Sequence, residues 1–544
     1  MTMNLADIWE AVADSLDNEV ALIHGEQQLT YRQFEDRAAR LASALQASGI
    51  GPGDKVALYL YNANEYLETT FAAFKLRAVP VNVNYRYLAN ELHYLLENAD
   101  AEAIVYHGAL AERVEAVRAR LPKLRTFIQV AGTDDDRRPL LDGARVYEDL
   151  IQGHGPAARI ERSPEDLVFL YTGGTTGLPK GVMWQHAELF KIFSAGYAAA
   201  GGEVPATPAE AGATAKRMRE MGVSGPSLAA APLMHGMAWF TSMGRLVTGC
   251  TVVSLTGRSF DAHELWQTVQ RHRVAFCVIV GDAFARPMIA ALEEAEAQGR
   301  PYDLSSLMLI VSGGVMWTAA SKKAFLDRGV GMLMDGLGSS EATGIGMMIT
   351  TAGENPTTGR FQLSPTTKVI AEDGRELTPG SEEIGILAVG GPLPVGYYKD
   401  ESKTEATFRV IGGVRYSIPG DYAKVEADGS ITLLGRGSVC INTGGEKVFP
   451  EEVEEVIKLH PAVEDCIVVG VPDAKWGEAI TAIVKLVPGA EAPEAEIIAA
   501  TRQHLAAYKA PKNVAIVEHI VRSPAGKADY RWAKETAKQH LARS

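Results

Sequence analysis

The sequence contains little cysteine and no cysteine pair. Its 544 residues include 4 cysteines, and no two of these are close enough to form a CxxC motif. Each cysteine lies among apolar neighbours, so buried reduced thiols are favoured, with metal ligands or disulfides as the open alternatives. The four positions are Cys250, Cys277, Cys440 and Cys466. Such cysteine usage is typical of the reducing cytosol.

An excess of basic residues and a long hydrophobic run are also absent. The net charge is −14, and Lys and Arg are scattered along the chain, which disfavours a nucleic-acid surface. No stretch reaches the ~20 apolar residues of a membrane-spanning helix. The N-terminal segment MTMNLADIWEAVADSLDNEV is acidic and has no signal-peptide core. We therefore expect a cytoplasmic protein with no nucleic-acid partner and no transmembrane segment.

Strands and helices alternate in the first part of the chain. Apolar residues recur at helical spacing from Tyr31 to about Ser48. The segments VALYLY, VPVNVN and AEAIVY are predicted strands, and EYLETTFAAFKLRA and NELHYLLENA are predicted helices between them. This βαβαβ order predicts a parallel sheet with helices on both faces. The Gly-, Ala- and Pro-rich segment 201–225 predicts an exposed insertion.

The sequence pattern changes twice towards the C-terminus. After about Thr367, apolar and polar residues alternate around DG turns, which predicts β-hairpins. After Arg436, amphipathic helices alternate with strands in a unit of about 100 residues, the size of a small domain. We therefore predict an α/β protein with a large N-terminal domain (residues 1–436) of parallel-sheet α/β layers plus a β-rich subdomain. A small α+β C-terminal domain (residues 437–544) follows it.

The segment YTGGTTGLPKGV (residues 171–182) follows the apolar strand LVFLYT. Its glycines let backbone N–H groups converge on an anion, its threonines add hydroxyl donors, and Lys180 adds a positive charge. The segment is not the GxxxxGK[ST] loop, because Pro179 precedes the lysine and Gly181 follows it. The pattern indicates a polyphosphate site, with a surface turn as the plain alternative.

Four separated motifs resemble those of the adenylate-forming superfamily, which includes acyl-CoA synthetases, nonribosomal-peptide adenylation domains and beetle luciferases. YTGGTTGLPKGV resembles the phosphate loop, and GLGSSEATG (336–344) the Tyr-Gly-x-Thr-Glu motif. PGDYAKVEADGSITLLGR (419–436) resembles the Gly-Asp…Gly-Arg segment, and SPAGKADYR (523–531) the C-terminal Gly-Lys loop. The resemblance implies that ATP activates a carboxylate as acyl-AMP with release of pyrophosphate, and that a thiol then takes the acyl group.

The resemblance implies roles for three candidate catalytic residues. Lys527 resembles the lysine that bridges the carboxylate and the α-phosphate, with a solvated loop lysine as the alternative. Glu341 resembles the glutamate that, with Thr175, holds Mg²⁺ on the phosphates, and Mg²⁺ prefers oxygen ligands. The alternative for Glu341 is a helix-capping acid after Ser339 or Ser340. His235, in APLMHGMAWF, resembles the histidine beside the substrate carboxylate, with a core histidine as the alternative.

The resemblance also implies a nucleotide site. Asp421 resembles the carboxylate that binds both ribose hydroxyls, and Arg436 the arginine that reaches the ribose. Leu337 replaces the tyrosine that usually packs on adenine, so an aliphatic contact is expected there. The predicted nucleotide-binding residues are Thr172, Gly173, Gly174, Thr175, Thr176, Gly177, Lys180, Gly313, Gly314, Val315, Asp335, Gly336, Leu337, Gly338, Ser339, Ser340, Asp421 and Arg436.

In the family the small domain is mobile, and its rotation admits the thiol. Ser438 stands where the family usually carries the Asp or Lys pivot, and Gly444 and Gly445 resemble the turn that faces coenzyme A. Trp239 resembles the tryptophan that gates the acyl tunnel in fatty acyl-CoA synthetases, with core packing as the alternative. The predicted acyl pocket consists of His235, Gly236, Met237, Trp239, Gly281, Gly314 and Gly338.

Small pocket residues leave volume for apolar substrate, where each buried CH₂ contributes ~0.8 kcal/mol. No Arg or Lys is placed for a second carboxylate, and no acid for an α-amine. The sequence thus predicts an ATP-dependent acyl-CoA ligase for a medium- or long-chain fatty acid or a bulky, steroid-like carboxylate. ATP, Mg²⁺ and coenzyme A are the expected small-molecule partners, and a homodimer stays open.

Three other functions fit the sequence less well. An adenylating enzyme that loads a separate carrier protein is disfavoured, because the sequence ends soon after Lys527 without a carrier domain. A nucleotide-binding module without chemistry is disfavoured because Lys527 and Glu341 are both present. A serine hydrolase is more remote, since no GxSxG elbow follows a strand.

Overall fold

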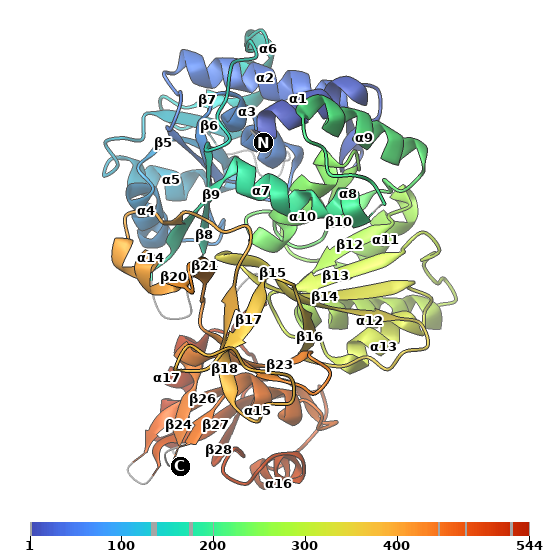
Figure 1. Ribbon diagram of the computed structural model, residues 1–544, viewed down its shortest axis with the longest axis vertical. Helices are drawn as coiled ribbons and strands as arrows, with labels where there is room; N and C mark the ends of the chain where they lie inside the picture. The colour runs from blue at the N-terminus through green and yellow to red at the C-terminus, as the bar shows by residue number, and fades with distance from the viewer. Residues whose placement is uncertain are drawn as a thin grey trace.

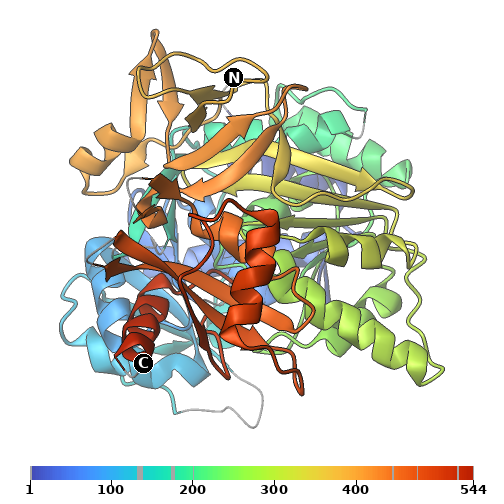
Figure 2. The same ribbon diagram turned by 90° about the horizontal axis from the view of Figure 1, so that it is seen from below.

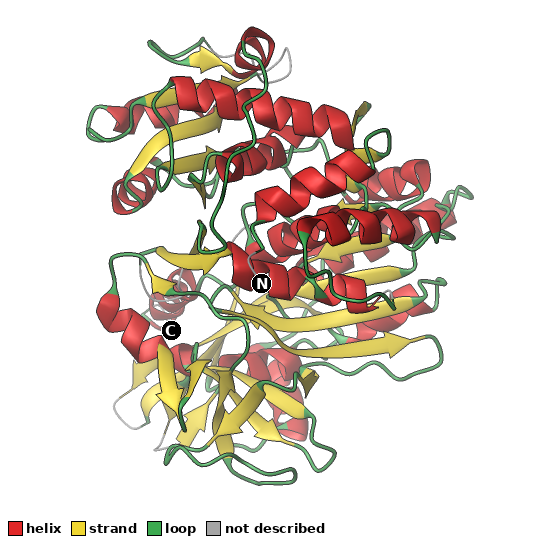
Figure 3. Ribbon diagram, turned by 45° about the horizontal axis from the view of Figure 1, so that its top comes forward, coloured by secondary structure: helices red, strands yellow, loops and turns green. Residues whose placement is uncertain are grey.

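The computed structural model describes residues 3–131, 139–172, 178–199, 201–443, 446–473, 476–522 and 526–542. Two large sheets with their helices form the upper part of the molecule, and a smaller unit lies below them (Figure 1). Seen from below, the small unit lies in front of the larger layers (Figure 2). Helices surround the N-terminal sheets, whereas strands predominate in the lower part (Figure 3).

The N-terminal sheet has eight strands in the order β19-β9-β8-β4-β3-β5-β6-β7. Its strands are β3 (Lys55–Tyr59), β4 (Val79–Asn82), β5 (Ala101–His107), β6 (Thr126–Val130), β7 (Arg145–Val146), β8 (Leu167–Thr172), β9 (Lys180–Gln185) and β19 (Gly396–Tyr397). The strands from β8 to β7 run parallel, as the βαβαβ order predicts, and β9 turns back antiparallel to β8.

Helices cover both faces of this sheet because its strands are apolar on both sides. In β3, Val56 and Leu58 point into one hydrophobic cluster, and Ala57 and Tyr59 point into another. The first cluster includes residues of α2 (Tyr31–Ala47), α3 (Asn64–Lys75) and α6 (Tyr147–Gly153), and the second includes residues of α4 (Ala89–Asn98) and α5 (Ala111–Arg118). The predicted helices and strands of this region are confirmed.

A 15-stranded sheet follows the order β2-β1-β11-β10-β12-β13-β14-β15-β16-β23-β22-β18-β21-β20, and β17 pairs with β18. Strands β1 (Val20–His24), β11 (Val252–Ser254), β10 (Ser227–Ala229), β12 (Phe276–Ile279), β13 (Leu309–Gly313) and β14 (Met332–Ser339) run parallel. Its helices include α10 (Gly236–Val247), α11 (Ala262–His272), α12 (Gly281–Ala297) and α13 (Ala319–Leu326). The parallel half therefore ends at β14.

The other half of this sheet is antiparallel. Its strands are β15 (Ala342–Thr351), β16 (Arg360–Leu363), β17 (Thr367–Ile370), β18 (Ile384–Val389), β20 (Phe408–Ile411), β21 (Val414–Ser417), β22 (Asp421–Val425) and β23 (Ile431–Arg436). At the opposite edge of the sheet, β2 (Gln27–Thr30) pairs antiparallel with β1. β22 and β23 form a hairpin around a DG turn, and β17 pairs antiparallel with β18. The β-rich region predicted after Thr367 is therefore confirmed.

Many residues of the segment 201–225 are exposed, as predicted, but the segment also contributes a packed helix to the fold. It contains α9 (Pro208–Glu220), whose N-terminus is capped by the Thr207 hydroxyl. α9 packs on α1 (Leu5–Ser15). A side chain at Gly212 would collide with the carbonyl group of Ala11, so the backbones approach closely. The small residues that suggested a loop form the buried face of a helix.

The C-terminal unit contains a five-stranded sheet with the order β25-β24-β27-β26, and β28 pairs with β27. Its elements are β24 (Ile441–Thr443), β25 (Glu446–Val448), α15 (Pro450–Ile457), β26 (Val463–Asp473), β27 (Gly477–Leu486), α16 (Glu494–His504), β28 (Asn513–Ile516) and α17 (Tyr530–Leu541). The sheet has its own apolar clusters. The domain division after Arg436 stays a prediction.

Two further sequence expectations concern thiols and membranes. Cys250, Cys277 and Cys466 are buried free thiols, whereas Cys440 is partly exposed. Within the described ranges, no helix has the length and apolar character needed to cross a membrane.

Candidate active site

Lys527 lies among residues that come from three other motifs. Its side chain is solvent-accessible, but surrounding protein desolvates it and lowers its pKa. The positive charge of Arg436 lowers the pKa further, while Glu341 and Asp421 raise it. His235 also lies within the electrostatic reach of Lys527. The fold therefore gathers five predicted site residues from distant parts of the chain.

Strand register places the two predicted ribose-binding residues, Asp421 and Arg436, side by side. Asp421 begins β22, Arg436 ends β23, and the two residues are direct cross-strand partners. Arg436 Nε lies 3.2 Å from Asp421 Oδ1. Asp421 is buried, and Arg436 keeps about a third of its side chain exposed (34%). The pair presents one carboxylate and one guanidinium beside Lys527.

Glu341 lies in the tight turn between β14 and β15. The hydroxyl of Tyr397 donates a hydrogen bond to Glu341 Oε1 over 2.9 Å, and Trp184 donates through Nε1 to the Ser340 carbonyl over 2.9 Å. The helix-capping alternative for Glu341 is wrong, because a strand follows it. Sequence reasoning missed Tyr397, which lies on β19 and carries no motif signal.

Lys180 begins β9 at the end of the predicted phosphate loop. Its Nζ lies 2.6 Å from Asp400 Oδ2 and 5.6 Å from the centre of the Tyr397 ring. Asp400 also caps α14 (Glu401–Thr407). Both charged side chains are about one-third exposed, so the pair contributes at most ~1 kcal/mol and a polyphosphate can compete for Lys180. Sequence reasoning missed Asp400.

Part of the predicted nucleotide and thiol sites lies outside the described residues. These positions are Gly173, Gly174, Thr175, Thr176, Gly177, Gly444 and Gly445. The same applies to residues 523–525 of the C-terminal Gly-Lys loop. Thr172, which ends β8, is described and half-buried. The roles predicted for all of these residues stay predictions.

Glycines allow the ends of β13 and β14 to approach each other. Gly313 pairs with Gly336, and a Cβ at Gly313 would lie 2.9 Å from the Gly336 carbonyl oxygen and 3.2 Å from Met237 Sδ. Gly314 has φ +85°, a conformation that favours glycine. Leu337 packs against the apolar cluster of the β-rich region. The backbone around Gly313 is therefore tightly packed beside Met237.

Asp335 is held in a buried ion pair and is not open to a ligand. Its Oδ2 lies 2.8 Å from Lys322 Nζ, and only 7% and 2% of the two side chains are exposed. Lys322 also donates to the Thr357 carbonyl over 2.8 Å. Burial raises the pKa of Asp335, and Lys322 opposes that shift. The Asp335 side chain therefore supports β14, and its nucleotide role stays a prediction.

The predicted acyl segment forms the start of α10. His235 precedes the first helical residue, its Nε2 is shielded from solvent, and that atom has no hydrogen-bond partner among the described residues. Burial and the positive charges of Lys527 and Arg86 lower the pKa of His235 to about 3. The imidazole is therefore neutral near pH 7. It can accept or donate one hydrogen bond at a substrate carboxyl group.

Trp239 is buried and packs at 5.4 Å from Phe240 and 6.3 Å from Phe193, measured between ring centres. Core packing therefore accounts for its position, and the gate role stays a prediction. The Gly281 amide donates to Ser312 Oγ over 2.8 Å. A Cβ at Gly281 would collide with the Met316 carbonyl group, so close packing also explains this glycine.

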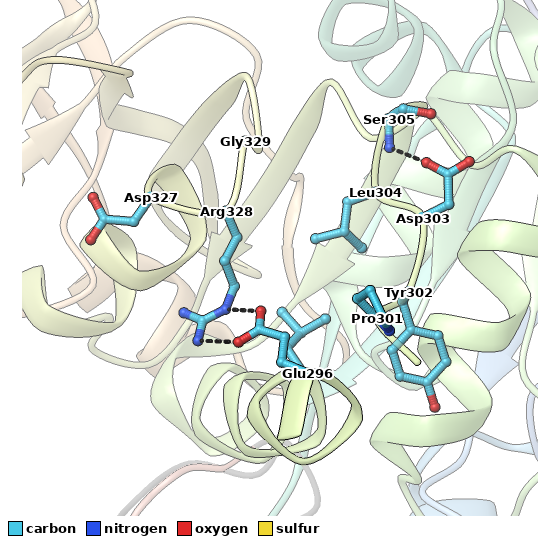
Figure 4. Close-up of a pocket in the computed structure, with 10 residues that line it drawn as sticks. Glu296, Pro301, Tyr302, Asp303, Leu304, Ser305, Asp327, Arg328 and Gly329 are labelled. Carbon is cyan, nitrogen blue, oxygen red and sulfur yellow. Dashed lines mark hydrogen bonds and ion pairs between the residues drawn. The ribbon is translucent and has the colours of Figure 1, made fainter. Parts of the chain in front are cut away.

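A separate surface pocket of about 500 Å³ lies away from these residues (Figure 4). Its lining residues are Leu292, Glu296, Pro301, Tyr302, Asp303, Leu304, Ser305, Asp327, Arg328 and Gly329. Arg328 pairs with Glu296 across it, with Nε 2.9 Å from Oε1. None of the predicted site residues lines this pocket, so it is not part of the candidate active site.

Comparison with known proteins shows the family of this chain. The AMP-binding enzyme family matches residues 9–398, and the AMP-binding enzyme C-terminal domain matches residues 452–527. The 3-oxocholest-4-en-26-oate--CoA ligase of Rhodococcus rhodochrous is 42% identical over 98% of this chain and 96% of its own. The medium/long-chain-fatty-acid--CoA/3-oxocholest-4-en-26-oate--CoA ligase of Mycolicibacterium smegmatis is 41% identical over 100% of this chain and 98% of its own.

Solved structures share the whole fold. The anthranilate CoA ligase AuaEII in complex with anthranoyl-AMP superimposes with a TM-score of 0.82 at 24% identity, covering 99% of this chain and 98% of its own. ATP-bound MatB from Rhodopseudomonas palustris gives a TM-score of 0.80 at 25% identity, covering 99% of this chain and 100% of its own. The fold class and family predicted from the sequence are confirmed. The protein belongs to the family of AMP-binding enzymes.

Proposed function

We propose that this protein is an ATP-dependent acyl-CoA ligase that forms AMP. The observation that carries the proposal is the gathering of Lys527, Glu341, Asp421, Arg436 and His235 at one place. The names of relatives that are 41–42% identical over nearly the whole chain support the same reaction class.

In the first half-reaction, a carboxylate oxygen attacks the α-phosphorus of ATP. The bond between that phosphorus and the bridging oxygen of the β-phosphate breaks, so acyl-AMP and pyrophosphate form. Two negative groups must approach each other, so preorganised positive charge lowers the barrier. The Lys527 ammonium is the group of this chain that stands beside the ribose-binding pair and His235, and we assign it to this step.

In the second half-reaction, the sulfur of coenzyme A attacks the acyl carbon and releases its proton. The bond between that carbon and the phosphate oxygen breaks, so acyl-CoA and AMP form. We propose that the small domain, residues 437–544, moves between the two half-reactions. The short 3₁₀ turn Gly437–Val439, which links β23 to β24, supports this assignment. Gly444 and Gly445 keep their predicted role at the thiol.

Glu341 suits a magnesium ion that arrives with ATP. The described residues contain no cluster of three or more His, Cys, Asp or Glu side chains, so protein ligands alone would not enclose a metal there. Mg²⁺ usually takes one or two carboxylates and completes its shell with phosphates and water. A bound Mg²⁺ would neutralise phosphate charge, and Glu341, oriented by Tyr397, would hold it.

We propose that the acid is a medium- or long-chain fatty acid or a bulky, steroid-like carboxylate. The names of the two relatives support this substrate class. Of the small residues in the predicted pocket, Gly314 leaves open space, since no atom lies within 4 Å of where its Cβ would be, whereas Gly281 is closely packed. An apolar pocket gains free energy with each buried CH₂, which favours longer chains.

The test is a panel of carboxylic acids from C2 to C18 with aromatic and steroid acids, scored for pyrophosphate, AMP and thioester with and without coenzyme A. We expect thioester and AMP only with coenzyme A, with a maximum on long or ring-bearing acids. If acyl-AMP accumulates and coenzyme A does not change its amount, the acceptor is another molecule, such as a carrier protein. No pyrophosphate from any acid would refute the proposed function.

A further inference from the structure

Lys527 is held by a network that the proposed reaction does not itself explain. Arg522 lies five residues before Lys527, and its Nη1 donates to the carbonyl oxygen of Gly526 over 3.2 Å. Gly526 is the residue whose peptide bond leads directly into Lys527. Arg522 and Ala528 also form an antiparallel bridge on either side of this stretch. Arg522 therefore contacts the backbone on both sides of Lys527.

Arg522 is itself fixed to the small sheet. Its Nε and Nη2 donate to the two oxygens of Asp465 over 2.7 and 2.8 Å, and Nη2 also reaches the Cys466 carbonyl over 3.0 Å. Lys458 approaches Asp465 Oδ1 at 3.2 Å. Burial raises the pKa of Asp465, but Arg522 and Lys458 together outweigh it and lower the pKa to about 2. A forked guanidinium–carboxylate pair fixes direction as well as distance. Only 18% and 26% of the Arg522 and Asp465 side chains are exposed.

Both ends of this network rest on α12 of the large domain. Gly526 has φ +69°, and a Cβ there would lie 2.7 Å from the Cβ of Ala283. Arg286 donates to the carbonyl oxygen of Glu464, the residue before Asp465. Residues three apart lie on one face of a helix, so Ala283 and Arg286 contact the small domain from the same side. The backbone before Lys527 and the start of β26 therefore both contact α12.

We propose that Arg522, anchored by Asp465, is a positioning residue that sets Lys527 for acyl-AMP formation. This inference rests on the proposed function. Arg522 donates to the Gly526 carbonyl, and the Gly526 backbone packs against α12, while the Lys527 side chain lies within the electrostatic range of Glu341 and Asp421. Misplacement of a catalytic group by 1 Å can cost about 10²-fold in rate. The second half-reaction does not use Lys527, so it does not need the contacts of Arg522 with Asp465 and Gly526.

The experiment compares Arg522→Gln, Arg522→Lys and Asp465→Asn with wild type in two separate assays. Pyrophosphate release from ATP and the best acid of the panel reports the first half-reaction. Thioester formation from supplied acyl-AMP and coenzyme A reports the second. We expect Arg522→Gln to slow the first by about 10- to 100-fold and the second by less than about 2-fold. Arg522→Lys keeps the positive charge but not the paired hydrogen bonds of the guanidinium, and we expect it to recover part of the rate of pyrophosphate release.

The control is Lys509→Gln, which breaks another small-domain ion pair, with Lys509 Nζ 2.6 Å from Glu452 Oε1. It should leave both half-reactions unchanged. Arg522→Gln in a Lys527→Ala background should add no further loss to pyrophosphate release, because Arg522 acts through Lys527. Melting temperatures show whether each variant folds. If Arg522→Gln does not fold, Asp465→Asn is compared with wild type in its place.

Three results would overturn the inference. Equal losses in both half-reactions for every folded variant would mean a general structural role. A full additional loss in the double variant would mean that Arg522 acts independently of Lys527. A wild-type protein that releases no pyrophosphate would refute the proposed function, and this inference with it.

Discussion

Replacing Lys527 by alanine tests the core of the proposed mechanism. The ammonium is a positive charge within the electrostatic range of Glu341, Asp421 and His235. We expect Lys527→Ala to suppress acyl-AMP formation and to leave supplied acyl-AMP competent for thioester formation. The side chain is solvent-accessible and lies in no apolar cluster, so the free energy of unfolding should change by less than about 0.5 kcal/mol.

The size of the effect follows from electrostatics. Two unit charges 4 Å apart interact by about 4 kcal/mol at an effective dielectric constant of about 20. Each 1.36 kcal/mol changes a rate tenfold, so losing one such interaction in the transition state costs about 10³-fold. Removal of one preorganised donor from an oxyanion site costs about 10²–10³-fold, which is the same range. We therefore expect a 10²–10³-fold loss in the first half-reaction.

The pH dependence provides a second measure of the same group. Desolvation by the surrounding protein and the positive charge of Arg436 lower the pKa of Lys527, and only the protonated form supplies the charge. The first half-reaction of wild type should therefore decline with rising pH earlier than an ordinary lysine would titrate, and Lys527→Ala should lack this decline.

Rapid-quench measurement of pyrophosphate gives the first rate, and thioester formation from synthetic acyl-AMP gives the second. Lys509→Ala, which removes a small-domain lysine paired with Glu452, is the matched control and should change neither rate. Equal losses in both half-reactions, or a residual first rate within tenfold of wild type, would refute the assignment of Lys527.

Three further predictions follow from single contacts. His235 has a pKa of about 3 in the folded protein against about 6.5 unfolded, so its contribution to stability is complete above pH 6.5 and is lost as the pH falls towards 3. Between pH 7 and pH 5, the free energy of unfolding in urea should therefore fall less in His235→Asn than in wild type, and equal falls would contradict this. Asp335→Asn breaks the buried pair with Lys322 and should lower the free energy of unfolding by about 3–5 kcal/mol, whereas a loss below about 1 kcal/mol would show that the pair is solvated. Gly526→Ala adds a Cβ that would lie 2.7 Å from the Cβ of Ala283, at a left-handed backbone position. It should slow pyrophosphate release at least tenfold and leave thioester formation unchanged; an unchanged rate of pyrophosphate release would show that the backbone adjusts to the added Cβ without displacing Lys527.

The local sequence by itself determined most of the elements and the family motifs. Periodicity predicted α2, β3, α3, β4 and β5, because burial of one helix stripe or of both strand faces leaves a pattern in consecutive residues. Motif resemblance indicated Lys527, Glu341, Asp421 and Arg436, and the fold brings these four together. The same reasoning missed the packed helix within 201–225, because alanine and glycine occur both in loops and on helix faces that pack closely.

Only the tertiary structure decided which side chains hold the site in place. Tyr397 on Glu341 joins residues 56 positions apart, and Asp400 on Lys180 joins residues 220 positions apart. Arg522 reaches Asp465 across 57 positions. Such contacts produce no periodic pattern in the sequence, because the partners become neighbours only through the order of the strands and the packing of distant segments. Local sequence fixes the backbone preference of each segment, whereas these pairings depend on how the packed segments meet.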